Sequence, residues 1–449
     1  MSFPRYPKYR DSGVEWLGEV PEHWEVKRLK KISPSMTVGV VVNPSTFVAN
    51  EGLPFIYGGD IREGLIDWEN ARRIDVDSSE ANSKTRLKAG DLLTVRVGAP
   101  GVTAVVPPAC EGGNCASVML IRQGGFNSYW LCYAMNTRIV RFQVEVVQYG
   151  AAQEQFNISH AVNFLVPTPL RAEQDWIAEF LDRETGKIDE LVAEQQRLME
   201  LLKEKRQAVI SHAVTKGLNP RASMKPSGIE WPEVVPAEWA VSRLKYLVAE
   251  RDGIQMGPFG GMLLDLDSEE TGFKVYGQEN TISGDFSLGS RWISKERFAL
   301  LHNYQIKNGD LLLTRKGSLG NARHVQDLPY PGIADSDTIR VRCNQGLIAR
   351  AFLALLLHSA RYVAEQITLS KRGAILPGLN SETIANISII LPPVAQQTEL
   401  LGYIAAETVR IETLAAEAQK AIDLLQERRT ALISAAVTGQ IDVRKLAAA

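Results

Sequence analysis

Two long helical patterns constrain this chain more than any other feature. Residues 171–214 contain no proline and a single glycine, Gly186, and apolar residues recur there at heptad spacing. Residues 394–437 repeat the pattern. Each stretch predicts a helix whose apolar stripe needs a partner helix to bury it. At about 1.5 Å per residue each helix would be roughly 65 Å long, so we expect the two to pair with each other.

The predicted seam consists of apolar residues that match between the two stretches. In the first stretch it comprises Leu181, Ile188, Leu191, Leu198, Leu202 and Val209, and in the second Ile404, Ile411, Leu414, Leu425 and Leu432. Charged residues interrupt the pattern at matched places, Glu184 with Glu407 and Lys205 with Arg428. A plain coiled coil would place apolar residues there, so these breaks are candidates for register control or for a partner contact.

The whole chain is written twice. SGVEW at 12–16 returns as SGIEW at 227–231, an offset of 215 positions. KAGDLLTVRVG at 88–98 matches KNGDLLLTRKG at 307–317 with an offset of 219, and PFIYGGDI at 54–61 matches the segment around Tyr276 and Gly277. Later matches, among them Gly150-Ala151 with Gly373-Ala374, have an offset of 223. Ordered matches at slowly drifting offsets indicate a tandem duplication with small insertions in the second copy.

The expected fold is an α/β (α+β) unit repeated twice, because short β-rich runs such as SVMLIR and ISIILP lie between helical segments. The long helices should form an antiparallel coiled coil that separates two globular domains. The predicted boundaries are 1–169 for the first domain, 170–216 for the first long helix, 217–228 for a linker, 229–392 for the second domain, 393–438 for the second long helix and 439–449 for a tail. The last five residues, KLAAA, resemble an appended end.

Composition and motifs argue against several classes of protein. A net charge of −2 does not suit a simple polybasic nucleic-acid binder, although a local basic face can coexist with it. There is no apolar run of membrane-spanning length and no signal-peptide pattern, so we expect a cytoplasmic protein. The four cysteines are expected to be free thiols; CEGGNC at 110–115 lacks further ligands for zinc. Phosphate-loop, GxSxG and HExxH motifs are missing, as is the Asn-Pro-Pro-aromatic loop of DNA amino-methyltransferases, so no catalytic residue is expected.

The duplicated, glycine-rich loops carry polar and basic residues suited to DNA. Arginine and lysine contact phosphates and guanine, whereas asparagine and glutamine suit adenine. The candidates are Arg62, Arg72, Arg73, Lys84, Arg86 and Arg96 in the first half, and Lys274, Gln278, Asn280, Arg291, Arg315, Lys316, Lys371 and Arg372 in the second. For any one of them, a solvated surface charge is the alternative. For Gly90-Asp91 with Arg96, and the copies Gly309-Asp310 with Arg315, we favour a structural turn with an ion pair, because it persists in both halves.

The repeated motifs resemble the specificity subunit of type I restriction-modification systems. They are SGVEWLGEVPEHWEVKRLKKI at 12–32, SGIEWPEVVPAEWAVSRLKYL at 227–247 and ERRTALISAAVTGQID at 427–442. The resemblance covers nearly the whole chain. It implies two target recognition domains, each reading one half of a bipartite asymmetric double-stranded DNA site, on a subunit with no catalytic activity. Base-reading residues do not carry over, because these domains vary within the family.

The resemblance also implies the partners. Two modification subunits, which are adenine methyltransferases, would dock on this chain, and two ATP-dependent restriction subunits would join through them. S-adenosylmethionine, ATP and magnesium are then expected only on the partners, and the helices would set the spacer of the DNA site. The alternatives are a coiled-coil scaffold with two protein-binding heads and no role on DNA, or a self-sufficient DNA methyltransferase, against which the missing loop argues.

Overall fold

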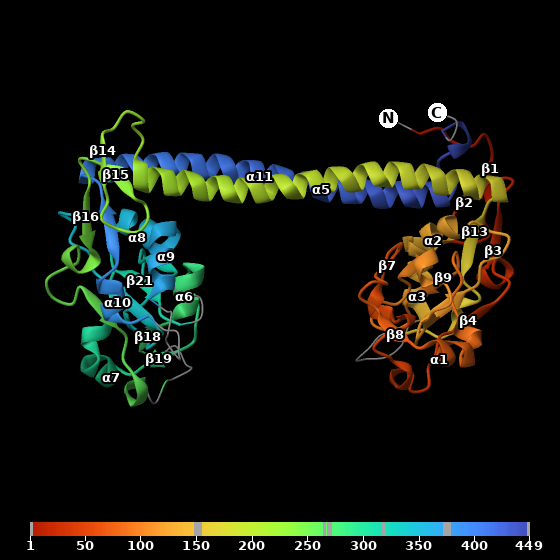
Figure 1. The fold of residues 1–449 in the computed structure, drawn as a ribbon, viewed down its shortest axis with the longest axis horizontal. Helices are drawn as coiled ribbons and strands as arrows, with labels where there is room; N and C mark the ends of the chain where they lie inside the picture. The colour runs from red at the N-terminus through yellow and green to blue at the C-terminus, as the bar shows by residue number, and fades with distance from the viewer. Residues whose placement is uncertain are drawn as a thin grey trace. The chain divides into compact units, whose positions relative to one another are not determined.

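Two long helices run through the protein. The computed structural model describes residues 3–147, 155–263, 266, 272–316, 320–370 and 379–446. Helix α5 spans Arg171–Lys216 and helix α11 spans Val394–Val437 (Figure 1). The chain forms two compact units: unit 1 combines Met1–Gln196 with Gln419–Ala449, and unit 2 is Arg197–Ala418. Each unit thus holds one globular part and about half of each long helix. The predicted domain boundaries, which treat the helices as separate segments, stay a prediction.

Unit 1 is built around a four-stranded antiparallel sheet in the order β10-β9-β12-β4. A second sheet, β11-β5-β8, packs beside it, and β13 pairs with β3. Helix α2 lies next to α5 (Figure 1), where the Tyr133 hydroxyl donates to Asp182 at 2.7 Å. The elements are β1 Tyr9–Asp11, β2 Glu19–Pro21, β3 Glu25–Arg28, β4 Met36–Val38, β5 Leu53–Ile56, β6 Ile61–Arg62, β7 Leu65–Ile66, β8 Arg72–Ile74, α1 Val76–Ala81, β9 Leu92–Thr94, β10 Thr103–Val105, β11 Asn114–Cys115, β12 Met119–Ile121, α2 Ser128–Asn136, α3 Arg138–Val147, α4 Ile158–Ala161 and β13 Leu165–Thr168.

Unit 2 repeats this plan. Its antiparallel sheet β17-β24-β21-β22 corresponds to β4-β12-β9-β10, and β16 pairs with β25 as β3 pairs with β13. Its elements are β14 Met224–Pro226, β15 Val234–Pro236, β16 Ala240–Arg243, β17 Ile254–Met256, β18 Phe273–Tyr276, α6 Gln278–Ser283, β19 Trp292–Ile293, α7 Lys295–Leu300, β20 Gln305–Ile306, β21 Leu311–Thr314, β22 Ala322–His324, β23 Gly332–Ala334, β24 Thr338–Val341, α8 Arg350–Ser359, α9 Arg361–Leu369, α10 Ser381–Ala385 and β25 Ser388–Leu391. The twofold-repeated mixed fold predicted from the sequence is confirmed.

One predicted match is displaced by a residue. The amide of Tyr57 donates to the Asp60 carboxylate at 2.7 Å, and the amide of Gly277 donates to the Asn280 side-chain oxygen at 3.0 Å. The structure therefore aligns Tyr57 with Gly277 and not with Tyr276. The matched Gly150-Ala151 and Gly373-Ala374 lie outside the described residues.

The helix seam follows a heptad, with inward positions alternately four and three residues apart. In α5 it runs through Leu181, Thr185, Ile188, Val192, Gln195, Met199 and Leu202, all buried or half-buried. In α11 it runs through Ile404, Thr408, Ile411, Ala415, Ala418, Ile422, Leu425, Arg429 and Leu432. The predicted seam residues Leu181, Ile188, Leu202, Val209, Ile404, Ile411, Leu425 and Leu432 all belong to this inward face.

The structure does not place three predicted residues in the seam. Leu191, Leu198 and Leu414 are 45%, 41% and 47% exposed. Each of these leucines lies three residues after an inward position, whereas the next inward position there lies four residues further on. Val192, Met199 and Ala415 occupy those positions and point inward instead. The three leucines have the apolar character of seam residues, but they do not follow the alternating four- and three-residue spacing of the inward positions.

The predicted breaks in the seam also resolve differently. Glu184 bonds the Lys187 ammonium at 2.8 Å on its own helix, and Glu407 pairs with Arg410 at the matching position. Lys205 and Arg428 are exposed. None of the four therefore interrupts the inward face; the charged residue among the inward positions named above is Arg429.

Two ion pairs cross between the long helices at equivalent places. In unit 1, Arg429 of α11 lies 2.9 Å from Asp189 of α5. In unit 2, Arg206 of α5 lies 3.9 Å from Glu412 of α11. The residues of the two pairs are related by the 223-position repeat. When two repeated helices pair antiparallel, a contact between them must occur twice, with the roles of the two helices exchanged. The two ion pairs show this exchange and support the predicted antiparallel coiled coil.

The end of the chain belongs to the core of unit 1. The amide of Asp442 donates to the Pro4 carbonyl at 2.8 Å, and Val443 is fully buried. The predicted tail at 439–449 is therefore packed at least up to residue 446, the last that the structure describes. Within the described residues no helix is long and apolar enough to cross a membrane.

Candidate nucleic-acid interface

The duplicated glycine turn before β9 and β21 is structural, as favoured from the sequence, but its ion pair has another partner. Asp91 accepts from the Lys88 amide at 3.0 Å and from Arg122 at 2.6 Å. Asp310 accepts from the Lys307 amide at 2.9 Å and from Arg342 at 2.8 Å. The partner comes from the neighbouring strand's end, a contact that sequence spacing alone does not reveal.

Arg96 and Arg315 hold a distant segment in place. The Arg96 guanidinium donates to the Phe156 carbonyl at 3.1 Å, and Arg315 donates to the Leu379 carbonyl at 3.0 Å. Both side chains are half-buried. Because a backbone carbonyl satisfies each guanidinium in the same way in both units, we assign these two candidates to the framework.

Two candidates of unit 2 lie inside the protein. Lys274 is 1% exposed, its ammonium donates to the Ser287 carbonyl at 2.6 Å, and it lies 5.6 Å from the centre of the Trp292 ring. Asn280 is fully buried, and its amide nitrogen donates to the Asp285 and Leu288 carbonyls. Neither side chain can reach a DNA surface without unfolding its surroundings. Lys274 is held among aromatic rings and Asn280 caps a turn, and the sequence pattern predicted neither contact.

Two further candidate cations of unit 2, Arg291 and Lys316, are paired with acids. Arg291 donates to Glu279 at 3.1 Å and to Asp335 at 3.0 Å. Burial raises the pKa of Asp335, an effect that the hydrogen bond from Thr338 and the charge of Arg291 oppose. Lys316, which is exposed, lies 2.7 Å from Asp337. Gln278 is half-buried, and Lys371 and Arg372 lie outside the described residues.

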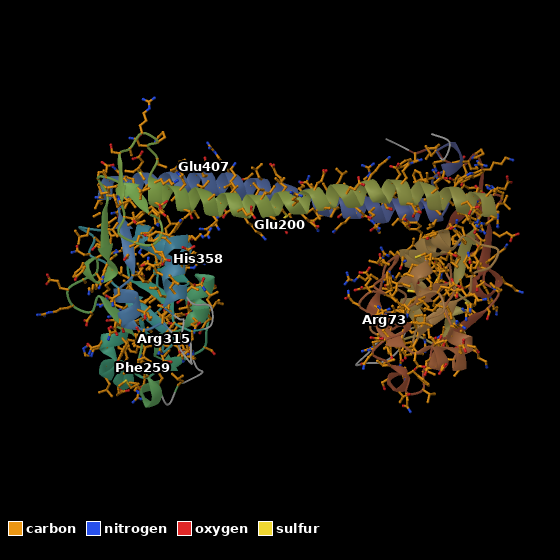
Figure 2. All side chains as sticks on the ribbon, viewed as in Figure 1. Arg73, Glu200, Phe259, Arg315, His358 and Glu407 are labelled. Atoms are coloured by element: carbon orange, nitrogen blue, oxygen red, sulfur yellow. The ribbon has the colours of Figure 1, made fainter. Side chains whose placement is uncertain are left out.

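Unit 1 presents freer cations. Arg62, Arg72 and Lys84 are exposed, and no ion pair is found for them among the described residues. The Arg72 guanidinium stacks over the Tyr57 ring at 4.2 Å. Arg86 is exposed with Glu80 4.0 Å away, and the half-buried Arg73, labelled in Figure 2, donates to the Glu69 carbonyl at 3.1 Å.

Sequence reasoning missed an exposed apolar loop in each unit. Val41 and Val42 are 58% and 73% exposed in unit 1, and Phe259 and Met262 are 44% and 47% exposed in unit 2. In Figure 2 Phe259 lies beside Arg315, whose guanidinium is 4.8 Å from the ring centre. The sequence signal for the loop of unit 1 is Asn43-Pro44, a pair typical of turns, which directly follows an apolar run. The pair indicates that the run ends in a turn and does not continue as a strand.

The cysteines show no sign of a metal or redox site. All four are free, and burial raises the pKa of Cys115 to about 12. A thiol held protonated is neither a good nucleophile nor a ready metal ligand. Among the described residues, no group of three or more His, Cys, Asp or Glu side chains is arranged to hold a metal ion.

Comparison with known proteins gives consistent relatives. No family model matches the chain. The StySPI type I restriction enzyme specificity subunit of Salmonella potsdam is 21% identical over 94% of this chain and 90% of its own length. The putative MjaX specificity subunit of Methanocaldococcus jannaschii is 20% identical over 95% and 96%. The EcoKI specificity subunit of Escherichia coli K12 is 20% identical over 94% and 90%.

Solved structures share the fold. A chain from a study of complex assembly and conformational transition of the type I R-M system aligns with a TM-score of 0.69 at 15% identity, covering 94% of this chain and 99% of that one. The HsdS subunit from Thermoanaerobacter tengcongensis aligns with a TM-score of 0.56 at 18% identity, covering 94% and 98%. The curated relatives are specificity subunits of type I restriction enzymes. Along nearly its whole length the chain thus resembles the specificity subunits of type I restriction-modification systems, and the resemblance predicted from its repeated motifs is confirmed.

Proposed function

We propose that this chain is the DNA-recognition subunit of a type I restriction-modification complex, and that each globular part reads one half of a bipartite, asymmetric site. The observation that carries the proposal is the full-length similarity to specificity subunits on a fold that is duplicated within one chain. A duplicated frame suits a two-part ligand, because each copy can evolve its own contacts on a common scaffold.

The two units offer different chemistry on that scaffold. In the described part of unit 1, no acidic partner is found for the exposed Arg62 and Arg72, whereas unit 2 pairs Arg291 and Lys316 with carboxylates. Free arginines suit phosphate and guanine contacts, and paired ones must first lose their partner. This difference favours an asymmetric site over a palindromic one.

The long helices are the proposed docking surface for two methyltransferase subunits. Each unit exposes a leucine of each helix at positions matched by the repeat: Leu191 and Leu424 in unit 1, and Leu414 and Leu201 in unit 2, between 45% and 55% exposed. The same apolar pair occurring once per unit fits two copies of one partner. Restriction subunits would join through the methyltransferases.

Introducing negative charge at one leucine pair tests this docking. We expect Leu191→Glu with Leu424→Glu to leave a complex with a single methyltransferase subunit, measured as mass by light scattering. Leu170→Glu, at an exposed leucine just before α5 (66%), is the matched control. A complex that keeps both subunits would exclude these leucines from the contact.

Sequencing of methylated adenines tests the recognition itself. The chain is co-expressed with its methyltransferase partner, and methylated adenines are mapped in the host genome. We expect a two-part motif with a fixed unread spacer, and exchange of residues 1–165 for those of a relative should change one half of it. A complex that binds its partners but leaves DNA unmethylated would favour the alternative, a protein scaffold with no role on DNA.

A further inference from the structure

Each unit carries an exposed apolar loop at the same place in its fold. The backbone crosses a neighbouring strand at Gly39 in unit 1, where a Cβ would lie 2.4 Å from the Cys115 carbonyl oxygen. It crosses at Gly257 in unit 2, where a Cβ would lie 1.8 Å from the Asp335 carbonyl oxygen. Only glycine allows so close a crossing. Directly after it the chain turns outward, into residues 40–48 in unit 1 and 258–263 in unit 2.

The loop of unit 1 is hydrogen-bonded at both ends and exposes its valines to solvent. Val40 is anchored, since its amide donates to the Cys115 carbonyl at 2.8 Å. Asn43 adopts a left-handed conformation with φ of 43°, and its carbonyl accepts from the amide and the hydroxyl of Thr46 at 3.0 and 2.8 Å. The loop returns at Ala49, whose amide donates to the Arg73 carbonyl at 2.9 Å. Ordering this turn costs conformational entropy, and the exposed Val41 and Val42 gain no burial that would offset the cost. Covering the two valines with a ligand would supply that burial.

Arginines lie beside both loops. Tyr57 packs against the small core cluster that contains Val40, and its ring carries the exposed Arg72. In unit 2 the Arg297 guanidinium donates to the Gly261 and Met262 carbonyls at 2.8 Å, and Arg315 covers one side of Phe259. Apolar side chains flanked by arginines match a duplex, in which phosphates border groove floors that carry thymine methyl groups.

We propose that these two loops are specificity-determining contacts to duplex DNA, in which Val41 and Val42 in one unit and Phe259 in the other pack on apolar base edges, foremost thymine methyl groups. This inference rests on the proposed function. It assigns base reading to apolar residues, with the exposed Arg72 of unit 1 on a phosphate, and so differs from base reading by polar side chains alone.

The test uses the complex of this chain with its methyltransferase subunits and fluorescent duplexes containing its site. For the double variant V41S/V42S we expect binding to the site to weaken about tenfold or more, with unchanged affinity for unrelated duplex and an unchanged dependence on salt. Replacing thymines of one half-site by deoxyuridine removes only the methyl groups. It should weaken the wild type and leave the double variant unaffected, and Phe259→Ser should give the same pattern in the other half-site. Val146→Ser, at a valine of α3 that is 67% exposed, is the control for a surface change.

Three results would overturn the proposal: unchanged site affinity in V41S/V42S, an equal loss on site and unrelated duplex, or equal sensitivity of variant and wild type to deoxyuridine. A wild-type complex without sequence preference would refute the proposed function itself. A selective wild type with insensitive loop variants would refute only the role of the loops.

Discussion

Lengthening both helices by seven residues should lengthen the spacer of the DNA site. The two cross-helix ion pairs are centred on the Arg197–Leu198 peptide of α5 and the Lys420–Ala421 peptide of α11. Seven residues inserted at each point keep the heptad in phase, so both ion pairs and the seam can re-form on either side.

The expected magnitude follows from helix geometry. Seven residues at about 1.5 Å each add roughly 10 Å of helix, and B-DNA rises about 3.4 Å per base pair, so the preferred spacer should grow by about three pairs. Over three pairs the duplex also turns by roughly a third of its 10–10.5-pair repeat, so neighbouring lengths must be compared.

A duplex library that varies only the spacer provides the assay. The variant complex methylates the library, and sequencing reports the preferred length. A control variant with seven residues inserted in α5 alone should lose activity, because its seam is out of register. Methylation that stays at the original spacing in the doubly lengthened variant would refute the idea that the helices measure the spacer.

Four further variants test the framework and the interface. Ile411→Ala, at a seam position 5% exposed, should lower the free energy of unfolding by about 2–3 kcal/mol, and Leu414→Ala by no more than about 0.5 kcal/mol, measured by chemical denaturation. Arg342→Ala leaves the buried Asp310 carboxylate without its 2.8 Å partner, so unfolding should become easier by about 2 kcal/mol; an unchanged midpoint would mean that solvent replaces the pair. Arg62→Ala should weaken binding to all duplexes alike and reduce the slope of log affinity against log salt by about 1, and a loss confined to the specific site would instead indicate base reading.

The sequence predicted the large features because they are written in periodicity and repetition. Both long helices, their pairing and the duplicated sheet units follow from apolar spacing and matched motifs, which act locally along the chain. The prediction of the inward face agrees with burial at Ile188 and Ile411, where an apolar residue occupies an inward position of the heptad. It failed at Leu191, where an apolar residue lies on the outer face.

The candidate site was harder to predict, because exposure depends on contacts between distant segments. Lys274 has the composition of a DNA contact, yet aromatic rings from later in the chain enclose it. Arg96 and Arg315 look like surface cations but hold backbone carbonyls 60 and 64 residues away. The apolar loop at Val42 was overlooked because apolar residues are assumed to be buried. Only the fold shows which side chains are left on the surface.

The most direct test of the account is a map of adenine methylation made by this chain with its methyltransferase partner in a host that otherwise lacks the modification. The account predicts one bipartite, asymmetric motif with a fixed spacer, of which one half changes when unit 1 loop residues Val41 and Val42 are replaced and the other half when Phe259 is replaced. A continuous or palindromic motif, or a motif that is the same whichever globular part is exchanged, would contradict it.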